Sequence, residues 1–340
     1  MLEETIPHLL VLGSVALVAF CLSFETNLLL RPWLAQHALA RPNARSSHQD
    51  PTPQGGGIAV IVATLFTLWG ALILLPRPEQ DQTIVLLTLT AAVLLLGIVG
   101  AIDDVRSLPP GPRLIAQAIA VAALIASFPA DVRLFPELSW WIERVVLFVA
   151  GVWFVNVVNF MDGIDWMTVA EFVPVCAALI LMAVAEGLDW FSALLASALL
   201  GAITGFAPFN KPIAKLFLGD VGSLPAGLLL GWLLLQLAAK GQLITALILP
   251  LYYVADATIT LARRIAKGEP FWQAHRKHFY QRALANGFSV PEVIARVFAV
   301  NIALAILALI AMFAQNVALP VLLLAAALVG WLLRSFARPH

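Results

Sequence analysis

Carboxylate and amide side chains lie in a few short segments of this chain, and these segments end or begin long apolar runs. Asp103-Asp104 directly follows one apolar run, Asn159 ends a second, and Asp220 opens a third. Adjacent carboxylates at the end of an apolar segment are costly unless a cation or a proton compensates them. Oxygen ligands without cysteine suit a hard cation, so the pattern predicts Mg²⁺, with Mn²⁺ as the alternative.

Basic side chains accompany these acids in the polar segments. A hard cation surrounded by basic groups suits phosphoryl transfer, because the metal bridges phosphate oxygens while the basic groups neutralise developing charge. A carboxylate would then position or deprotonate the nucleophile. The sequence contains neither a Walker motif nor a kinase signature, which excludes ATP hydrolysis by those routes. The candidate basic residues are Arg45, His48, Lys215, His275, Arg276 and His278.

The elements that must position these residues are membrane-spanning helices. The chain has 340 residues, of which 61% are hydrophobic and 12% charged, whereas a soluble domain is about 45–50% apolar and about 25% charged. Its mean hydropathy is +0.92. A bilayer core about 30 Å thick needs roughly 20 apolar residues of helix. Such runs predict an all-α, polytopic transmembrane bundle in a single domain of residues 1–340, with about eleven spans at 7–30, 55–76, 83–102, 112–129, 141–160, 166–186, 190–208, 216–239, 242–264, 292–314 and 317–334.

The distribution of lysine and arginine predicts the orientation of these spans. Cytoplasmic loops carry an excess of Lys and Arg. The loops after odd-numbered spans, with the segment after the last span, hold fifteen of them, and the opposite loops hold only Arg77, Arg133 and Lys240. We therefore expect the odd loops and the carboxyl terminus in the cytoplasm and the amino terminus outside. The formal net charge is zero, which leaves no electrostatic footprint for nucleic acid.

Each polar cluster also has a purely structural explanation. Asp103-Asp104 could be a solvated helix end, Asp165 could cap the helix that follows it, and Asp220 could form a turn. The histidines of the late loop could be ordinary loop residues. However, the predicted orientation places all of these clusters on one membrane face, which favours a substrate-processing site over separate structural roles. A site built on many membrane spans favours a lipid phosphate as the nucleophile.

The order of the motifs resembles a known family. The chain resembles the polyprenyl-phosphate N-acetylhexosamine-1-phosphate transferases, the MraY/WecA-like superfamily, from about Arg41 to Ser289. The matching motifs are Pro51-Thr52-Pro53 with the glycine run after it, Asp103-Asp104, Asn159-Phe160-Met161-Asp162-Gly163-Ile164-Asp165, Phe217-Leu218-Gly219-Asp220-Val221-Gly222-Ser223 and the late histidine loop. The resemblance implies transfer of a sugar-1-phosphate from a UDP-sugar to undecaprenyl phosphate, with release of UMP.

The resemblance also assigns catalytic and metal-binding roles. Asp103 and Asp104 would lie beside the lipid phosphate, with Asp103 activating it. Asp220, helped by Asn159, would hold Mg²⁺ on the diphosphate. Two histidines, His275 and His278, would complete the catalytic set. A direct attack by the lipid phosphate is the preferred mechanism, and a covalent aspartyl-phosphate stays open.

Other residues are implied to bind the substrates. Asp165 matches the uracil contact and Asp162 lies near the nucleotide in the resemblance, while Arg276 belongs to the loop that clamps the diphosphate or the sugar. The remaining substrate-binding candidates on the same face are Lys215, Arg45 and His48.

Departures from the family pattern bear on the donor sugar. Trp166 and Met167 follow Asp165, where the family often has other residues. The histidine loop lacks the three adjacent histidines of the peptidoglycan-precursor branch, and it is more similar to the O-antigen and enterobacterial-antigen branches. The resemblance therefore implies a multi-pass enzyme of the bacterial inner membrane that starts a lipid-linked glycan such as O-antigen. GlcNAc and a 6-deoxy-N-acetylhexosamine stay open as the sugar, and a homodimer is one alternative for the oligomeric state.

Two competing functions make different predictions. An ion-coupled transporter should carry acids near the middle of its spans, together with discontinuous helices. Only Glu171 and Asp256 fit that description, and polar contacts between helices explain them as well. A CDP-alcohol phosphotransferase would pack its carboxylates into one extended segment, whereas the carboxylates of this chain are dispersed.

Overall fold

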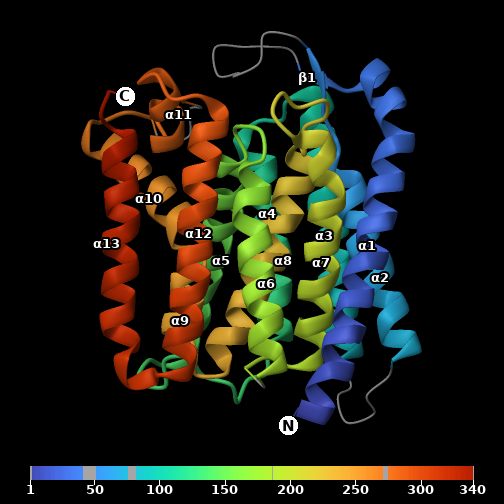
Figure 1. Cartoon of the computed structure of the whole chain (residues 1–340), viewed down its shortest axis with the longest axis vertical. Coiled ribbons are helices and arrows are strands. Elements are labelled where there is room, and N and C mark those ends of the chain that lie inside the picture. The colour runs from blue at the N-terminus through green and yellow to red at the C-terminus, as the bar shows by residue number, and fades with distance from the viewer. Residues whose placement is uncertain (1, 41–50, 76–81, 186, 271–274, 340) are drawn as a thin grey trace.

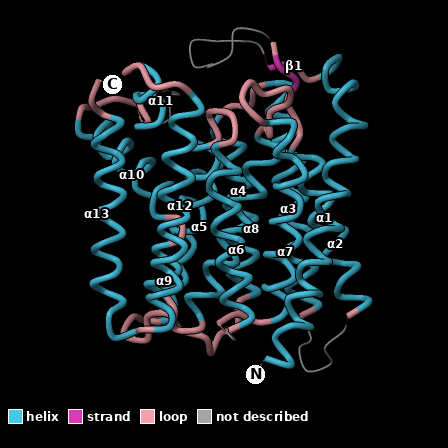
Figure 2. The backbone as a smooth tube through the Cα atoms, viewed as in Figure 1, coloured by secondary structure: helices cyan, strands magenta, loops and turns pink. Residues whose placement is uncertain are grey.

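The computed structural model of the chain is a bundle of long helices whose loops gather at its two ends (Figures 1 and 2). It describes residues 2–40, 51–75, 82–185, 187–270 and 275–339. The helices are α1 (Leu2–His37), α2 (Gly57–Leu74), α3 (Thr83–Arg106), α4 (Pro110–Ser127), α5 (Trp140–Met161), α6 (Met167–Val184), α7 (Trp190–Asn210), α8 (Asp220–Ala239), α9 (Leu243–Ile248), α10 (Leu251–Ala266), α11 (Phe279–Ala285), α12 (Val290–Phe313) and α13 (Ala318–Phe336), with a 3₁₀ turn, η1 (Gln315–Val317), before α13. Two short strands, β1 (Leu39–Ala40) and β2 (Thr52–Pro53), pair antiparallel with Leu39 opposite Pro53.

Ten of the helices in the described ranges are long and apolar enough to cross a membrane. An α-helix satisfies its own backbone hydrogen bonds, which is why apolar segments of this length cross lipid as helices. The expected all-α polytopic bundle is confirmed. Ten of the predicted spans correspond to these ten helices. Their ends differ by up to four residues, except that the first helix continues seven residues beyond the predicted end at 30.

The remaining predicted span, 242–264, is wrong as a single helix. The segment forms α9 and α10, which are separated at Leu249 and Pro250. Proline has no backbone N–H to donate and its ring clashes with the preceding turn, so it ends the first helix. A further short helix, α11, lies within the late polar loop and was not predicted.

The core of the bundle is formed by α6, α7 and α8. In their most apolar stretches 67%, 78% and 83% of the residues are buried inside the protein, against 22% for α1 and 28% for α4. A helix that is hydrophobic all round is stable only when lipid or protein covers every face. The outer helices therefore present apolar side chains to the outside of the bundle. The central helices α7 and α8 support the polar loops at its end.

Figure 1 places the two termini at opposite ends of the bundle. The end that carries the carboxyl terminus also carries β1 and α11 (Figure 1). The C-terminal ends of α3 and α5 and the N-terminal end of α8 lie there as well, because each span reverses the direction of the chain. The predicted alternation therefore brings the motif-bearing loops to one end.

Candidate functional site

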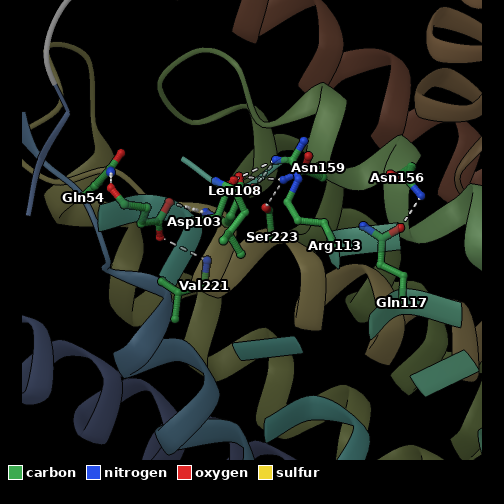
Figure 3. A network of polar contacts seen from close by, with 11 residues as sticks. Gln54, Asp103, Leu108, Arg113, Gln117, Asn156, Asn159, Val221 and Ser223 are labelled. Carbon is green, nitrogen blue, oxygen red and sulfur yellow. Dashed lines mark hydrogen bonds and ion pairs between the residues drawn. The ribbon is translucent and has the colours of Figure 1, made fainter. Parts of the chain in front are cut away.

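Three helix ends place polar residues that the sequence analysis singled out side by side. Asp103 lies in the last turn of α3, Asn159 lies in the last turn of α5, and Asp220 is the first residue of α8. Arg113 comes from the first turn of α4. Figure 3 shows the labelled side chains of Asp103, Arg113 and Asn159 directed toward one another.

Arg113 joins the two predicted catalytic and metal-binding carboxylates. Its Nη1 lies 2.7 Å from Asp103 Oδ2 and 3.0 Å from Asp220 Oδ2. The side chains are 29% exposed for Arg113, 12% for Asp103 and 23% for Asp220, so the cluster is reachable from solvent but partly shielded from it. One cationic group therefore occupies the space between two carboxylates. The backbone N–H of Leu108 also donates to Asp103 Oδ1.

Asn159 holds the other oxygen of Asp220. Its amide nitrogen donates to Asp220 Oδ1 at 2.8 Å and to the hydroxyl of Ser223 at 2.9 Å. Asn156, one turn earlier on α5, donates instead to Gln117 of α4 at 2.6 Å (Figure 3). The two asparagines that share a helical face thus connect α5 to two different neighbours, and only Asn159 reaches the carboxylate cluster.

Asp104 is directed away from this cluster and toward the backbone of α8. Its Oδ1 accepts from the N–H of Asp220 at 2.9 Å, and its Oδ2 accepts from the N–H of Val221 at 3.1 Å. The first N–H groups of a helix have no partner within the helix, so a carboxylate there stabilises the helix start. Asp104 fixes where α8 begins and thereby the position of Asp220. Its predicted catalytic role stays a prediction beside this structural one.

The glycine run after β2 packs against the segment that precedes Asp220. Gly57 donates from its N–H to Leu218 O at 2.9 Å, and a Cβ on Gly57 would lie 2.1 Å from the Cα of Gly222. The amide of Gln54 donates to the main-chain oxygen of Asp104 (Figure 3). The first motif therefore braces the start of α8 through backbone contacts that only glycine allows.

The predicted nucleotide-side residues lie around the start of α6. Asp162 accepts a hydrogen bond from the hydroxyl of Thr168 at 2.5 Å. Burial raises the pKa of the Asp162 carboxyl to about 7, and the nearby negative charges of Asp220 and Asp165 act in the same direction. Asp165 is buried and accepts from the N–H of Ala214 at 2.9 Å, which ties it to the loop between α7 and α8.

Lys215, from that same loop, is exposed. Its backbone N–H is held by Phe209 O at 2.8 Å, which fixes the loop while leaving the side chain at the surface. Arg45 and His48 lie outside the described residues, so their predicted roles stay predictions.

A buried carboxylate organises the histidine loop. Asp256 of α10 accepts from the N–H groups of Phe279 at 2.9 Å and Tyr280 at 3.2 Å, and its Oδ1 lies 3.2 Å from His278 Nδ1. The Tyr280 hydroxyl donates to Phe160 O at 3.1 Å. Because Phe160 follows Asn159, this bond connects the histidine loop to the helix end that holds Asp220.

The two histidines of the loop differ in their surroundings. The rings of His275 and His278 lie 4.8 Å apart, and the His278 ring also stacks on Tyr280. Burial lowers the pKa of His275 to about 4, and the positive charges of Arg264 and Lys277 act in the same direction. His275 is therefore neutral at pH 7 in this state. Arg276 is exposed and has its guanidinium available to an anion.

The donor set at the centre fits a magnesium ion. The carboxylates of Asp103 and Asp220 face the same point, which the Arg113 guanidinium occupies, and all of their donor atoms are hard oxygens. Among the described residues there is no group of three or more His, Cys, Asp or Glu that could form a complete cage. Mg²⁺ characteristically uses one or two protein carboxylates and takes its other ligands from water and substrate phosphates. The predicted cation remains a proposal, with Asp220 as its best-placed protein ligand. Asn159, the other residue predicted to hold the metal, donates its amide nitrogen to Asp220 Oδ1 and to the Ser223 hydroxyl and so supports Asp220.

Two residues in this network were not among the sequence-derived candidates. Arg113 is one of the fifteen basic residues of the predicted cytoplasmic loops and had no predicted role in the site, although its place directly after Pro109-Pro110-Gly111-Pro112 fixes it at a helix start. Asp256 was treated as a structural contact between helices. An acid in an otherwise apolar segment twenty-two residues before His278 was the available signal, and no spacing rule connects the two.

The fold and the site together define the class of protein. It is a polytopic membrane protein with a cluster of carboxylate, amide and guanidinium groups at one end of its helical bundle. The family model described as glycosyl transferase family 4 matches residues 85–238, which include Asp103, Arg113, Asn159 and Asp220. The chain is 24% identical to a probable undecaprenyl-phosphate N-acetylglucosaminyl 1-phosphate transferase of Bacillus subtilis, over 86% of this chain and 84% of that protein.

Two further relatives come from mycobacteria. A decaprenyl-phosphate N-acetylglucosaminephosphotransferase of Mycobacterium tuberculosis strain H37Rv is 28% identical over 76% of this chain and 71% of its own length. A phospho-N-acetylmuramoyl-pentapeptide-transferase of Mycobacterium sp. strain KMS is 27% identical over 75% and 87%. The resemblance to the polyprenyl-phosphate N-acetylhexosamine-1-phosphate transferase superfamily, predicted from the motifs, is confirmed by these matches.

Proposed function

We propose that this protein transfers an N-acetylhexosamine-1-phosphate from a UDP-sugar to undecaprenyl phosphate and releases UMP. The relatives support the general reaction, a sugar-phosphate transfer to a polyprenyl phosphate. The UDP-sugar donor, the cytoplasmic face of the bacterial inner membrane and the start of a glycan such as O-antigen are the finer parts of the proposal. They rest on the positive-inside pattern and on the form of the histidine loop.

The observation that carries the proposal is the Asp103–Arg113–Asp220 cluster at the end of the bundle. Its Nη1–Oδ2 distances of 2.7 and 3.0 Å put one positive group between two carboxylates, next to the Asn159 amide. A phosphate-bearing substrate brings negative charge to this point. The arginine can bind that charge, while the carboxylates can bind a cation that accompanies the phosphates.

In the proposed reaction an oxygen of the lipid phosphate attacks the phosphorus that carries the sugar. The new P–O bond forms as the bond from that phosphorus to the bridging oxygen breaks, and the bridging oxygen leaves with UMP. Asp103 orients the lipid phosphate and keeps it deprotonated, while Arg113 binds the negative charge that spreads over the transferring group. Mg²⁺, when bound through Asp220, would neutralise the diphosphate and polarise its P–O bonds. A covalent aspartyl-phosphate is the alternative route.

The histidine loop would close the donor side of the site. Asp256 and Tyr280 anchor the loop against α10 and α5, which would give His278 and Arg276 a fixed base from which to contact the donor. Arg276 is exposed and can bind the diphosphate, and His278 can donate a hydrogen bond to it. Asp162 and Asp165 lie toward the nucleotide in this arrangement, with Lys215 at the rim.

The experiment that tests the function measures release of radiolabelled UMP by the purified protein. Undecaprenyl phosphate, Mg²⁺ and a panel of UDP-N-acetylhexosamines are supplied, and EDTA is the control. Lipid-dependent, EDTA-sensitive UMP from one donor establishes the reaction and names the sugar. Folded protein that releases no UMP from any donor would contradict the proposal. Activity that persists in EDTA would remove the metal from it.

The competing function is ion-coupled transport. The break between α9 and α10 supplies a discontinuous helix, which such transporters use. However, the two acids considered for transport have protein partners: Glu171 accepts from the amide of Asn301 at 2.7 Å, and Asp256 holds the histidine loop. Uptake of a sugar nucleotide into vesicles without UMP release would favour transport.

A further inference from the structure

A cavity of about 310 Å³ lies beside the histidine loop, between the C-terminal part of α10 and α11. Its volume is at the lower end of the range for small-molecule sites, about 300–1,000 Å³. Its lining includes no residue of the Asp103–Arg113–Asp220 cluster. The charged residues that line it are Arg263, Arg264, Lys267, Glu269, Lys277 and Arg282.

Glu269 forms ion pairs with two of these cations. Its Oε1 lies 2.6 Å from Lys277 Nζ, and its Oε2 lies 3.2 Å from Arg264 Nε. The hydrogen bond from Lys277 lowers the pKa of Glu269, which therefore stays ionised. Glu269 carries a single negative charge, so it cannot balance all five basic side chains of the cavity.

Three basic side chains are left with excess charge, namely Arg263, Lys267 and Arg282. Within the described part of the chain, no ion pair is formed by any of them. Like charges that share one cavity repel, and a bound anion would relieve that repulsion. The cavity is therefore complementary to a group with one or two negative charges.

Two of the three cations are held in place by one aromatic ring. The guanidinium carbon of Arg263 lies 4.8 Å from the centroid of the buried Phe279 ring, and that of Arg282 lies 5.6 Å from it. Stacking on a ring restricts the side chain and leaves the N–H donors of its edge free. The site is built before a ligand arrives, and its donors suit phosphate geometry.

The cavity lies where a membrane surface would be. On α10 the side chains of Ile259 and Ile265 are exposed, at 38% and 55%, while Arg263 and Lys267 face the cavity. An amphipathic helix end of this kind lies at the boundary between the apolar core and the headgroups. Figure 1 places α11 at the same end of the bundle as the carboxyl terminus, where the lysine and arginine bias also predicts the anionic leaflet.

We propose that this cavity binds the phosphate of an anionic phospholipid headgroup through Arg263, Lys267 and Arg282. The acyl chains would lie along the exposed apolar side of α10. This site is separate from the proposed transferase site, and its occupancy does not depend on that activity. Because Lys277 and Arg282 flank His278 in the chain, a bound headgroup would also stabilise the base of the histidine loop.

The test counts phospholipids bound to the purified full chain by native mass spectrometry in detergent. The probes are phosphatidylglycerol, phosphatidylcholine and inorganic phosphate. The variants are the pair Arg263→Gln with Lys267→Gln, and the single Lys267→Gln, which changes only an exposed side chain. The matched control pair is Arg31→Gln with Arg106→Gln, which removes the same charge from the same end of the bundle.

We expect one tightly retained phosphatidylglycerol on the wild type and on the control pair, with phosphatidylcholine bound far more weakly. The cavity pair should bind phosphatidylglycerol on the order of ten-fold more weakly, and the single variant should fall between. Equal losses in the cavity and control pairs would overturn the site, since only bulk charge would then matter. Full displacement of the lipid by millimolar inorganic phosphate would overturn the headgroup in favour of a free anion.

Discussion

His278 Nδ1 lies 3.2 Å from Oδ1 of Asp256, and both side chains are buried, at 5% and 0% exposure. The same carboxylate accepts the first N–H groups of α11, so one acid fixes both the histidine ring and the helix that follows it. The pair joins the α10 segment to the histidine loop. It gives that loop a rigid base from which to face a substrate.

Asp256→Asn should therefore act through His278. We expect kcat for UMP release to fall about ten- to hundred-fold, because a buried hydrogen bond to a charged group contributes about 1.5–3 kcal/mol. KM for the donor should change less. His278→Ala should also lower kcat, and adding Asp256→Asn to it should cost little more, since coupled residues are not additive. If the kcat losses of Asp256→Asn and His278→Ala multiply in the double variant, Asp256 does not act through His278 and supports only the fold. Asp256→Asn should then also lower the melting temperature.

Arg113→Gln removes the positive group between Asp103 and Asp220. We expect kcat/KM to fall at least ten-fold, because the substrate loses a guanidinium and two carboxylates are left facing each other. The concentration of Mg²⁺ that gives half-maximal rate should decrease, since the competing cation is gone. Arg106→Gln, at the exposed end of α3, is the matched control and should keep wild-type kinetics. Unchanged rates in Arg113→Gln would remove this residue from the site.

Substitutions at Asp220 and at Asp104 should affect different properties, the first catalysis and the second stability. Asp220→Asn should abolish UMP release, by about a hundred-fold or more, while the extracted protein keeps its thermal stability. Asp104→Asn should lower stability by roughly 1–2 kcal/mol, because it weakens two hydrogen bonds to the start of α8. Melting curves and rates for both variants check this. Loss of activity without loss of stability in Asp104→Asn, with the reverse in Asp220→Asn, would mean that Asp104 is the catalytic residue and Asp220 the structural one.

The fold was largely predictable from the sequence, because apolar segments of membrane length leave the chain few options. The exception is the pair α9 and α10, where Pro250 interrupts a segment that is otherwise apolar enough for one membrane-spanning helix. The candidate site was predictable as a set of loops on one face. What the sequence did not contain was the pairing: Arg113 bridging Asp103 and Asp220, or Asp256 contacting His278, depends on how α3, α4, α8 and α10 pack. Only the three-dimensional arrangement separates the adjacent Asp103 and Asp104 into a cluster residue and a helix cap.

Asp162 should make stability depend on pH. Its pKa is raised to about 7, chiefly by burial, whereas the carboxyl ionises near 4 in the unfolded chain. Between these values the folded state holds a proton that the unfolded state has lost, so stability falls as pH rises from 4 to 7. Asp162→Asn has no carboxyl group at this position, so this pH dependence should be absent from the variant. Thermal unfolding at pH 5, 6, 7 and 8 should show the wild type losing stability relative to the variant. Parallel curves would mean that the carboxyl ionises normally in the folded protein.

Gly163 and Tyr280 should behave as one unit, because a Cβ on Gly163 would lie 1.9 Å from the Tyr280 hydroxyl oxygen and 2.9 Å from its Cζ. Gly163→Ala must therefore displace the tyrosine and break its hydrogen bond to Phe160 O, which connects the histidine loop to α5. We expect a loss of about 1–3 kcal/mol in stability, as for overpacking in general, together with a lower rate of UMP release. Gly70→Ala, within α2, has no atom within 4 Å of the added carbon, so it should leave the rate unchanged and should not lower stability.

Tyr280→Phe removes the oxygen that Gly163→Ala would strike, so the double variant should recover part of the stability that the glycine variant loses. The recovery should be incomplete, since Cζ remains within 2.9 Å and the bond to Phe160 is still absent. Melting temperatures and rates for the wild type, both single variants and the double variant form a complete cycle. Strictly additive losses would show that the alanine is accommodated without moving Tyr280, and the bond from Tyr280 to Phe160 O would then persist in Gly163→Ala.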